Sequence, residues 1–216
     1  MGEKDKKLKF TATDIRTFFY CPRLYFFQEH LKEKPVSPRQ RVRLLLGRLY
    51  HVYKRLKGRL KGWKTEEQGY IELGSISIHG RADAVERGGE TLLVHEYKSG
   101  KAPRRGVWLS DLMQAVAYAF IFSRKTATRE LLVQIHYRDK SVRSRVDSDT
   151  IAIFVRALED MYIIKKHGVL PDPNPSPGKC SRCPFSGICK MMEVDGALSG
   201  WVREMGPIYP VGSQRN

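Results

Sequence analysis

Hydrophobic residues recur at helical spacing in five segments of the chain. The first of these segments runs toward Cys21, and Thr11 or Thr13 can cap its start. The second begins at Pro22, because proline is tolerated at the first helical position, where the missing N–H would have no partner. The same pattern predicts three more helices, over residues 39–61, 108–122 and 149–166.

The period of the pattern changes in the middle of the chain. Residues 68–79 alternate in part, as a strand or a pair of strands would. Residues 81–86 and 91–98 flank Gly88-Gly89, and two glycines between two such runs indicate a β-hairpin. A further strand is expected over residues 130–137. Strands mixed with helices in this way predict an α/β protein.

The chain is expected to form one domain of 216 residues without internal repeats. Proline residues stiffen the approach to the C-terminal cysteines. In order, we expect a flexible tail over residues 1–10, a helical part over 11–60, a central core over 61–170, a cysteine segment over 171–195 and a second tail over 196–216.

Composition adds a probable class of partner to this picture through its charge. The chain carries 39 lysine and arginine residues against 23 aspartate and glutamate residues, which gives a net charge of +16. A protein this basic usually binds a polyanion, most often nucleic acid, although a generally lysine-rich surface without such a partner is the alternative. The chain shows neither an apolar run long enough to span a membrane nor the apolar core of a signal peptide at its start. We therefore expect a cytoplasmic protein with reduced thiols.

The four cysteines are divided between the two ends of the chain. Cys180, Cys183 and Cys189 form a C-x2-C-x5-C run, and Cys21 is the fourth. Clustered cysteines in a reducing compartment suit a metal ion or an iron–sulfur cluster better than disulfides. Zinc sites with four thiolates usually draw two close pairs, so the division into one and three favours an iron–sulfur cluster, while zinc stays open. If Cys21 is the fourth ligand, the site ties the two ends of the fold together.

The cysteine site is far in sequence from the acidic residues described next, so a structural role is predicted for it. A set of four thiolates can hold a [4Fe–4S] or a [2Fe–2S] cluster, of which we favour the first. Three basic residues near the cysteines could help to hold DNA or could form a solvated rim: Arg23, Lys179 and Arg182.

An acidic and basic constellation lies in the middle of the chain. Glu96 and Lys98 are two residues apart on a predicted strand, so both project from one face. The apolar residues before them indicate a buried strand, where two charges are costly unless they are paired or bound to an ion. Asp83 lies on the partner strand of the same hairpin and is expected near Glu96. Two carboxylates at a strand end can hold Mg²⁺ or Mn²⁺.

Three further residues could complete this site. His51 would favour Mn²⁺, because imidazole suits the softer ions. Gln114 and Tyr118 are four residues apart and share one helix face, from which they could contact DNA or order the Lys98 side chain. Taken singly, these features are ordinary: a same-face ion pair, a surface histidine and a half-buried helix.

The chemistry that suits this constellation is phosphodiester hydrolysis. A bound metal ion polarises the phosphoryl oxygen and lowers the pKa of a bound water. Lys98 can then orient the water or stabilise charge on the phosphorus. Three basic residues directly after Lys98 are candidates for contacts with the DNA backbone: Lys101, Arg104 and Arg105.

The order of these motifs resembles the RecB-like branch of the PD-(D/E)XK nuclease superfamily. That branch carries a helix histidine, a Gly-x-x-Asp, a Glu-x-Lys and a Gln-x3-Tyr in this order. The corresponding residues here are His51, Asp83, Glu96 with Lys98, and Gln114 with Tyr118. Cys-Pro-Arg at residues 21–23 and the C-terminal cysteine run narrow the resemblance to the CRISPR-associated Cas4 exonuclease family.

The resemblance implies a restriction-endonuclease-like fold, in which a mixed central sheet is flanked by helices and an iron–sulfur cluster staples a helical part. It implies metal-dependent exonuclease cleavage of single-stranded DNA or DNA ends, with Asp83, Glu96 and Lys98 as catalytic residues. It also implies that the backbone carbonyl of Tyr97 adds a metal ligand. The expected role is to prepare DNA fragments for insertion as CRISPR spacers, beside the Cas1–Cas2 integrase. Alternatives are a RecB-like nuclease of a recombination complex, a DNA-end binding module without turnover, and a redox sensor that uses the cluster.

Overall fold

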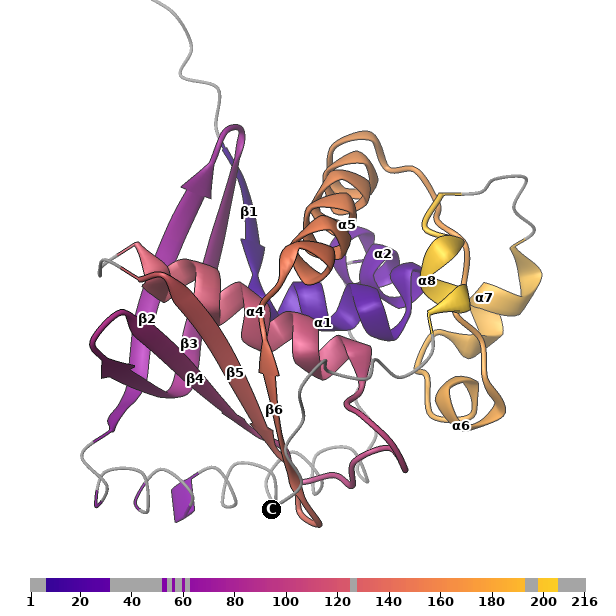
Figure 1. The fold of residues 1–216 in the computed structure, drawn as a ribbon. Helices are drawn as coiled ribbons and strands as arrows, with labels where there is room; N and C mark the ends of the chain where they lie inside the picture. The colour runs from indigo at the N-terminus through magenta and orange to yellow at the C-terminus, as the bar shows by residue number, and fades with distance from the viewer. Residues whose placement is uncertain are drawn as a thin grey trace, which may run out of the picture.

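The fold is a mixed six-stranded sheet with helices packed on it, seen in a computed structural model (Figure 1). The structure describes residues 7–31, 52–53, 56, 60, 63–124, 128–192 and 198–205. The helix expected over residues 39–61 therefore lies almost entirely outside the described residues. The named elements are β1 (Leu8–Thr11), α1 (Ala12–Tyr20), α2 (Pro22–His30), β2 (Lys64–Leu73), β3 (Ile76–Gly88), β4 (Thr91–Tyr97), α4 (Leu109–Ser123), β5 (Glu130–His136), β6 (Ser141–Arg145), α5 (Ser148–His167), α6 (Pro177–Cys180), α7 (Ser186–Met191) and α8 (Trp201–Glu204).

The expected mixed sheet is confirmed, and β3 is its organising strand. β2 pairs antiparallel with β3 along almost its whole length. On the other side of β3, β1 pairs in parallel with residues 76–79, whereas β4 pairs antiparallel with residues 84–88. Residues 80–83 thus lie at a fork, where β1 and β4 separate along the same edge of β3. β5 then pairs in parallel with β4, and β6 pairs antiparallel with β5.

Local sequence signals explain where several elements begin. Thr11 caps α1 by accepting the N–H of Asp14, and the Asp14 carboxylate accepts the N–H of Thr11 in return, which is a capping box. Pro22 is at the start of α2, as expected. Gly89 has a φ of 57° in the turn between β3 and β4, a conformation that glycine adopts without strain. The predicted hairpin is therefore present.

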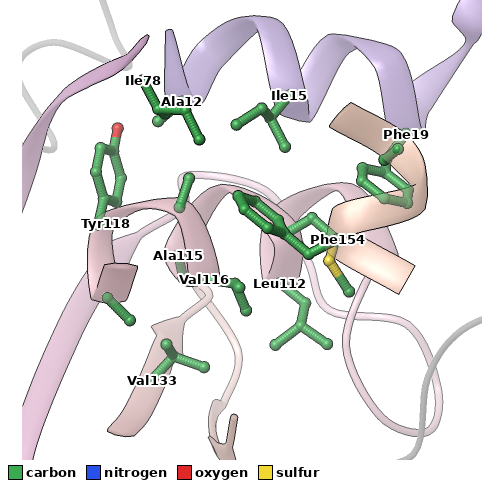
Figure 2. Packing of buried hydrophobic residues seen from close by; sticks show 14 of the residues in the cluster. Ala12, Ile15, Phe19, Ile78, Leu112, Ala115, Val116, Tyr118, Val133 and Phe154 are labelled. Atoms are coloured by element: carbon green, nitrogen blue, oxygen red, sulfur yellow. The ribbon is translucent and has the colours of Figure 1, made fainter. Parts of the chain in front are cut away.

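The core is built in layers around α4. Figure 2 shows Leu112, Ala115 and Val116 of α4 lying between Ile15 of α1 on one side and Val133 of β5 on the other. Nearly every residue of α4 is buried, because the sheet covers one side of this helix and α1 covers another. The polar residues of α4 must therefore find partners inside the protein. Among the described helices, none has the length and apolar character that a membrane span requires.

Both expected tails contain ordered, buried segments, which corrects the prediction from sequence. Within residues 1–10, Leu8 and the residues after it form β1, and Phe10 is fully buried in the core. Within residues 196–216, Trp201 packs on Phe19 and donates its Nε1–H to Asp160 Oδ2 at 2.9 Å. Both segments are short, so the apolar side chains that hold them had no periodic pattern to reveal them.

The strands also differ from the prediction in two places. Residues 76–88 form one continuous strand, although Gly80 suggested a division, because β2 pairs with β3 on both sides of that glycine. The strand Ser141–Arg145 was not predicted from the sequence; most of its residues are polar and exposed.

Two glycines that face each other across β2 and β3 let α4 approach the sheet closely. Gly69 and Gly80 are register partners. A Cβ atom at Gly80 would lie 2.6 Å from the ring of Tyr118, and one at Gly69 would lie 2.7 Å from Ile121. Both distances are shorter than van der Waals contact, so this part of the sheet admits only glycine without a shift of the helix.

Replacing Gly80 with alanine is expected to destabilise the protein by about 1–3 kcal/mol, the usual cost of overpacking a core. The matched control is Gly88→Ala in the same strand, where a Cβ atom meets nothing within 4 Å. Thermal unfolding followed by circular dichroism measures both variants. Equal shifts in Tm for the two variants would show that close helix packing is not the reason for glycine at this position.

Candidate active site

Asp83 lies at the fork in the sheet. The ladder between β3 and β4 ends at the pair of Ala84 and His95, and the next positions are Asp83 and Glu96. Here the Asp83 carboxylate takes the place of a backbone partner, since its Oδ2 accepts the N–H of Tyr97 at 2.9 Å. The hairpin register therefore brings Asp83 and Glu96 together, as the sequence predicted from the Gly88-Gly89 turn.

Lys98 joins the groups at the end of β4. Its Nζ lies 2.8 Å from Oε1 of Glu96 and donates to Oε1 of Gln114 at 2.6 Å. Its backbone N–H donates to the carbonyl of His136, which extends the ladder between β4 and β5 by one residue. The Glu96 side chain is only 5% exposed and that of Lys98 only 12% exposed, so this ion pair is largely shielded from water.

Asp111 and Arg16 also belong to this cluster, although they were not predicted from the sequence. Asp111 Oδ1 lies 3.3 Å from the Lys98 Nζ and accepts the Arg16 Nε–H at 3.0 Å. Burial alone would raise the pKa of Asp111, but the charges and hydrogen bonds of Lys98 and Arg16 outweigh it, so the pKa lies below its usual value. Asp111 is therefore a carboxylate at neutral pH. A lone acid in an otherwise apolar helix, three residues before Gln114, was the signal that could have revealed it.

Gln114 connects Lys98 to Tyr118 along one face of α4. Its amide oxygen accepts from Lys98, and its Nε2 donates to the Tyr118 hydroxyl at 3.0 Å. Burial raises the pKa of Tyr118, and the nearby Glu96 charge raises it further, so this phenol stays neutral. The two residues are thus placed to order the Lys98 side chain, which was one of the two roles expected for them.

The basic loop after Lys98 is fastened to the strand connection between β5 and β6. Asp139 accepts the N–H of Ala102 at 2.9 Å, and Lys140 donates to the carbonyl of Pro103 at 2.8 Å. The side chains of three residues on this loop are exposed: Lys101, Arg104 and Arg105. They are accessible to a partner, and their contact with DNA stays a prediction.

The expected metal ligands can be placed only in part. His51 lies outside the described residues. Among the residues that are described, no group of three or more histidine, cysteine, aspartate or glutamate side chains stands in an arrangement that would hold a metal ion. Asp83 and Glu96 contribute the two carboxylates of the predicted set, and carboxylate oxygens are the ligands that Mg²⁺ and Mn²⁺ prefer.

The cysteines come from two parts of the chain that meet in the fold. Cys21 lies between α1 and α2, and the other three lie in the segment that contains α6 and α7. Burial raises the pKa of the Cys183 thiol, and the neighbouring Cys21, Cys189 and Cys180 raise it further, so all three lie close enough to act on it. The Cys21 sulfur accepts the N–H of Asn174 at 3.4 Å. Four thiols with an N–H donor beside them are a donor set that fits an iron–sulfur cluster.

Arg23 has a structural position, which corrects the suggestion that it could hold DNA. Its side chain is buried and donates to the carbonyl of Pro171 at 3.0 Å and to that of Met192 at 3.2 Å. It also lies 3.7 Å from the Cys189 sulfur. Arg23 therefore ties α2 to the cysteine segment through hydrogen bonds of its own. Lys179 similarly donates to the Tyr20 carbonyl at 3.1 Å.

The sheet, the fork and the paired carboxylates define a nuclease fold. Residues 38–190 match the family described as the PD-(D/E)XK nuclease superfamily, and the chain belongs to it. The fold class and the superfamily expected from the motifs are thus confirmed.

The curated relatives point to one branch of that superfamily. A CRISPR-associated exonuclease Cas4/endonuclease Cas1 fusion from Myxococcus xanthus (strain DK1622) is 29% identical over 81% of this chain, which matches only 30% of the fusion's length. A CRISPR-associated exonuclease Cas4 from Francisella tularensis subsp. novicida (strain U112) is 23% identical over 86% of this chain and 95% of its own length. These two relatives support the Cas4 family. The crystal structure of SSO0001, at 23% identity, has the same fold, with a TM-score of 0.59 over 88% of this chain and 87% of that one.

Proposed function

We propose that this protein is a metal-dependent DNA exonuclease that hydrolyses phosphodiester bonds in single-stranded DNA or at DNA ends. The observation that carries the proposal is the buried group at the fork of the sheet. There, Lys98 Nζ lies 2.8 Å from Glu96, and Asp83 is held beside Glu96 by the N–H of Tyr97. A nuclease superfamily, two adjacent carboxylates and one buried lysine together favour hydrolysis over binding alone.

The carboxylates of Asp83 and Glu96 would hold Mg²⁺ or Mn²⁺, and His51 and the Tyr97 carbonyl are the further ligands that the resemblance implies. In an extended strand the N–H and C=O of one residue point to the same side. Since the N–H of Tyr97 donates to Asp83, its carbonyl also points toward β3. A bound divalent ion would lower the pKa of a coordinated water and polarise the phosphoryl group.

The side chains around the carboxylates hold Lys98 in one position. Gln114 accepts from its ammonium, Asp111 lies beside it, and Arg16 compensates the Asp111 charge. A positioned ammonium can orient an attacking water or stabilise charge that develops on the phosphoryl oxygens. Because its partners are already in place, this stabilisation needs little reorganisation during the reaction.

The relatives' names support a role in CRISPR adaptation. One of them is a Cas4 exonuclease joined to a Cas1 endonuclease, which favours Cas1 as a partner here. We propose that the protein trims DNA fragments before the Cas1–Cas2 integrase inserts them as spacers. The net charge of +16 suits a DNA substrate.

The four cysteines are proposed to hold a [4Fe–4S] cluster with a structural role, for which a [2Fe–2S] cluster is the alternative. The proposal rests on the four thiols that gather between α1 and the C-terminal segment and on the N–H donors near them. The site binds elements that are far from the carboxylates in sequence, so its effect on catalysis would be indirect.

A nuclease assay tests the proposed function. End-labelled single-stranded and duplex DNA are incubated with the protein and Mg²⁺, Mn²⁺ or EDTA. We expect shortening of the single strand with a divalent ion and none with EDTA, because the carboxylates need an ion to act on the phosphate. DNA binding without cleavage under every condition would instead favour the DNA-end binding module.

A further inference from the structure

A cavity of about 500 Å³ lies on the β1 side of the fork, next to the candidate active site. It is formed where the start of α1 and the strands β1, β2 and β3 meet Tyr118 of α4. Figure 2 shows Tyr118 standing beside Ala12 and Ile78 at the edge of the core. The function proposed above assigns no role to this cavity.

The walls of the cavity are basic and rich in hydrogen-bonding groups. Lys9, His79 and Arg81 line it, together with Gln68 and the Tyr118 ring, and no carboxylate is among its described lining residues. Glu66 lies 3.6 Å from Arg81, but both side chains are substantially exposed, and such a pair is weak enough to be exchanged for another anion. This chemistry suits a phosphate group.

A chain of hydrogen bonds joins the cavity to the catalytic lysine. Tyr118 lines the cavity, its hydroxyl accepts from Gln114, and the Gln114 amide oxygen accepts from Lys98 at 2.6 Å. Arg81 is also only two residues before Asp83 on the same strand. A ligand in the cavity would therefore adjoin a phosphodiester held at the carboxylates.

An exposed aromatic pair stands beside the cavity. Tyr70 and His79 are register partners on β2 and β3, with ring centroids 5.3 Å apart and ring planes 18° apart. Burial and the neighbouring Lys9 charge lower the pKa of His79, so this ring is uncharged near neutral pH. Tyr70 is 62% exposed, which is unusual for an aromatic ring without a partner. A single-stranded nucleic acid offers both a phosphate for the cavity and an unpaired base for this ring.

We propose that the cavity binds a backbone phosphate of the DNA single strand that enters the active site, and that Tyr70 stacks on an adjacent base. This inference rests on the proposed nuclease function. It makes Lys9, Arg81 and Tyr70 determinants of affinity for a strand, without a part in the chemical step.

The test compares the double variant Lys9→Ala/Arg81→Ala with Arg129→Ala/Arg145→Ala. The control variant removes the same charge and, like the first, disrupts exposed ion pairs, here those with Glu90 and Glu130. Binding of a fluorescent oligothymidylate is measured by anisotropy in EDTA at several salt concentrations. The cavity variant is expected to bind about tenfold more weakly, and its salt slope should fall by about 1.4, or 0.7 for each lost phosphate contact on a single strand. The control should keep the slope of the unaltered protein.

Two further measurements separate the possible explanations. On bis(p-nitrophenyl) phosphate, a single phosphodiester without neighbours, the cavity variant should keep the activity of the unaltered protein, while kcat/KM on the oligothymidylate falls about tenfold. Tyr70→Ala should weaken strand binding by about fivefold or more, the loss of one stacked base. Thymidine monophosphate should displace the strand only poorly.

Several results would overturn the inference. Equal weakening in the two double variants would indicate general charge, and equal loss on both phosphodiesters would indicate damage to the catalytic site. Displacement by thymidine monophosphate at the affinity of the strand would assign the cavity to a mononucleotide. If the unaltered protein cleaves neither substrate, the proposed function fails, but the binding measurement in EDTA still decides whether the cavity holds a strand.

Discussion

Replacing Asp83 with asparagine is expected to abolish cleavage of single-stranded DNA while the fold is retained. The amide oxygen of asparagine can still accept the N–H of Tyr97, which holds the end of β4 against β3. The substitution removes only the negative charge, and with it one of the two carboxylates that would bind a divalent ion. We expect a loss of at least about a hundredfold in kcat, as is usual when a main electrostatic element of an active site is removed. Gel assays with Mn²⁺ measure this loss.

The control for this variant is Asp147→Asn, which makes the same change of charge elsewhere. Asp147 caps α5 by accepting the N–H of Thr150, and asparagine caps helices about as well as aspartate. This variant should keep full activity and stability. Unchanged cleavage by Asp83→Asn would reject the proposed site.

Lys98→Ala should lose activity to a similar degree, but with an additional loss of stability. It leaves the buried carboxylate of Glu96 without the ammonium at 2.8 Å, whereas Asp111 keeps Arg16. Removing one partner of a buried ion pair commonly costs about 3–5 kcal/mol. Asp83→Asn is thus the cleaner test of chemistry, and the difference in Tm between the two variants reports how strongly Lys98 holds the site together.

Replacing Cys21 with serine is expected to lower the thermal stability of the protein more than any other single change discussed above. Cys21 would be the ligand that ties α1 and α2 to the C-terminal segment, and it is separated from the other cysteines by most of the chain. The free energy of binding a structural metal is folding free energy, about 10 kcal/mol or more for structural zinc. Losing a third of such a contribution would lower Tm by about 10 °C in a domain of this size.

Iron analysis and thermal unfolding of the same samples measure this effect. The cluster-bearing protein should lose iron and stability together on Cys21→Ser, whereas the substitution should change little in protein whose iron has been removed by a chelator. Activity should fall only as far as the folded fraction falls. A variant that kept its Tm but lost cleavage would contradict the structural role. Arg23, which links the same two segments through Pro171 and Met192, should preserve part of this connection without the cluster.

Much of the fold was predictable from the sequence, because several boundaries are set by local chemistry. Thr11 and Asp14 specify the start of α1 within four residues, and the glycine pair at 88–89 specifies the hairpin. That hairpin fixes the register, and the register is what sets Asp83 opposite Glu96. The predicted neighbours in the site therefore followed from a turn that could be recognised in the sequence.

Other features depended on contacts between distant residues. Phe10 was assigned to a tail because the short strand around it pairs with β3, far along the chain. Arg23 was placed on a possible DNA surface, although the carbonyls that bury it come from the other end of the molecule. Short polar segments such as β6 carry no periodic pattern, so their pairing partner alone makes them strands.

The sequence by itself determined the superfamily, the helices and hairpin of the core, and the residue types that could carry out hydrolysis. These are properties of spacing, which the linear chain contains. Only the tertiary structure decided that Arg16 and Asp111 hold Lys98, that Gly80 lets Tyr118 approach the sheet, and that a basic cavity adjoins the site. Each of these depends on how α1 and α4 pack against the fork in the sheet. Such packing joins residues that are far apart in the chain, so no local pattern records it.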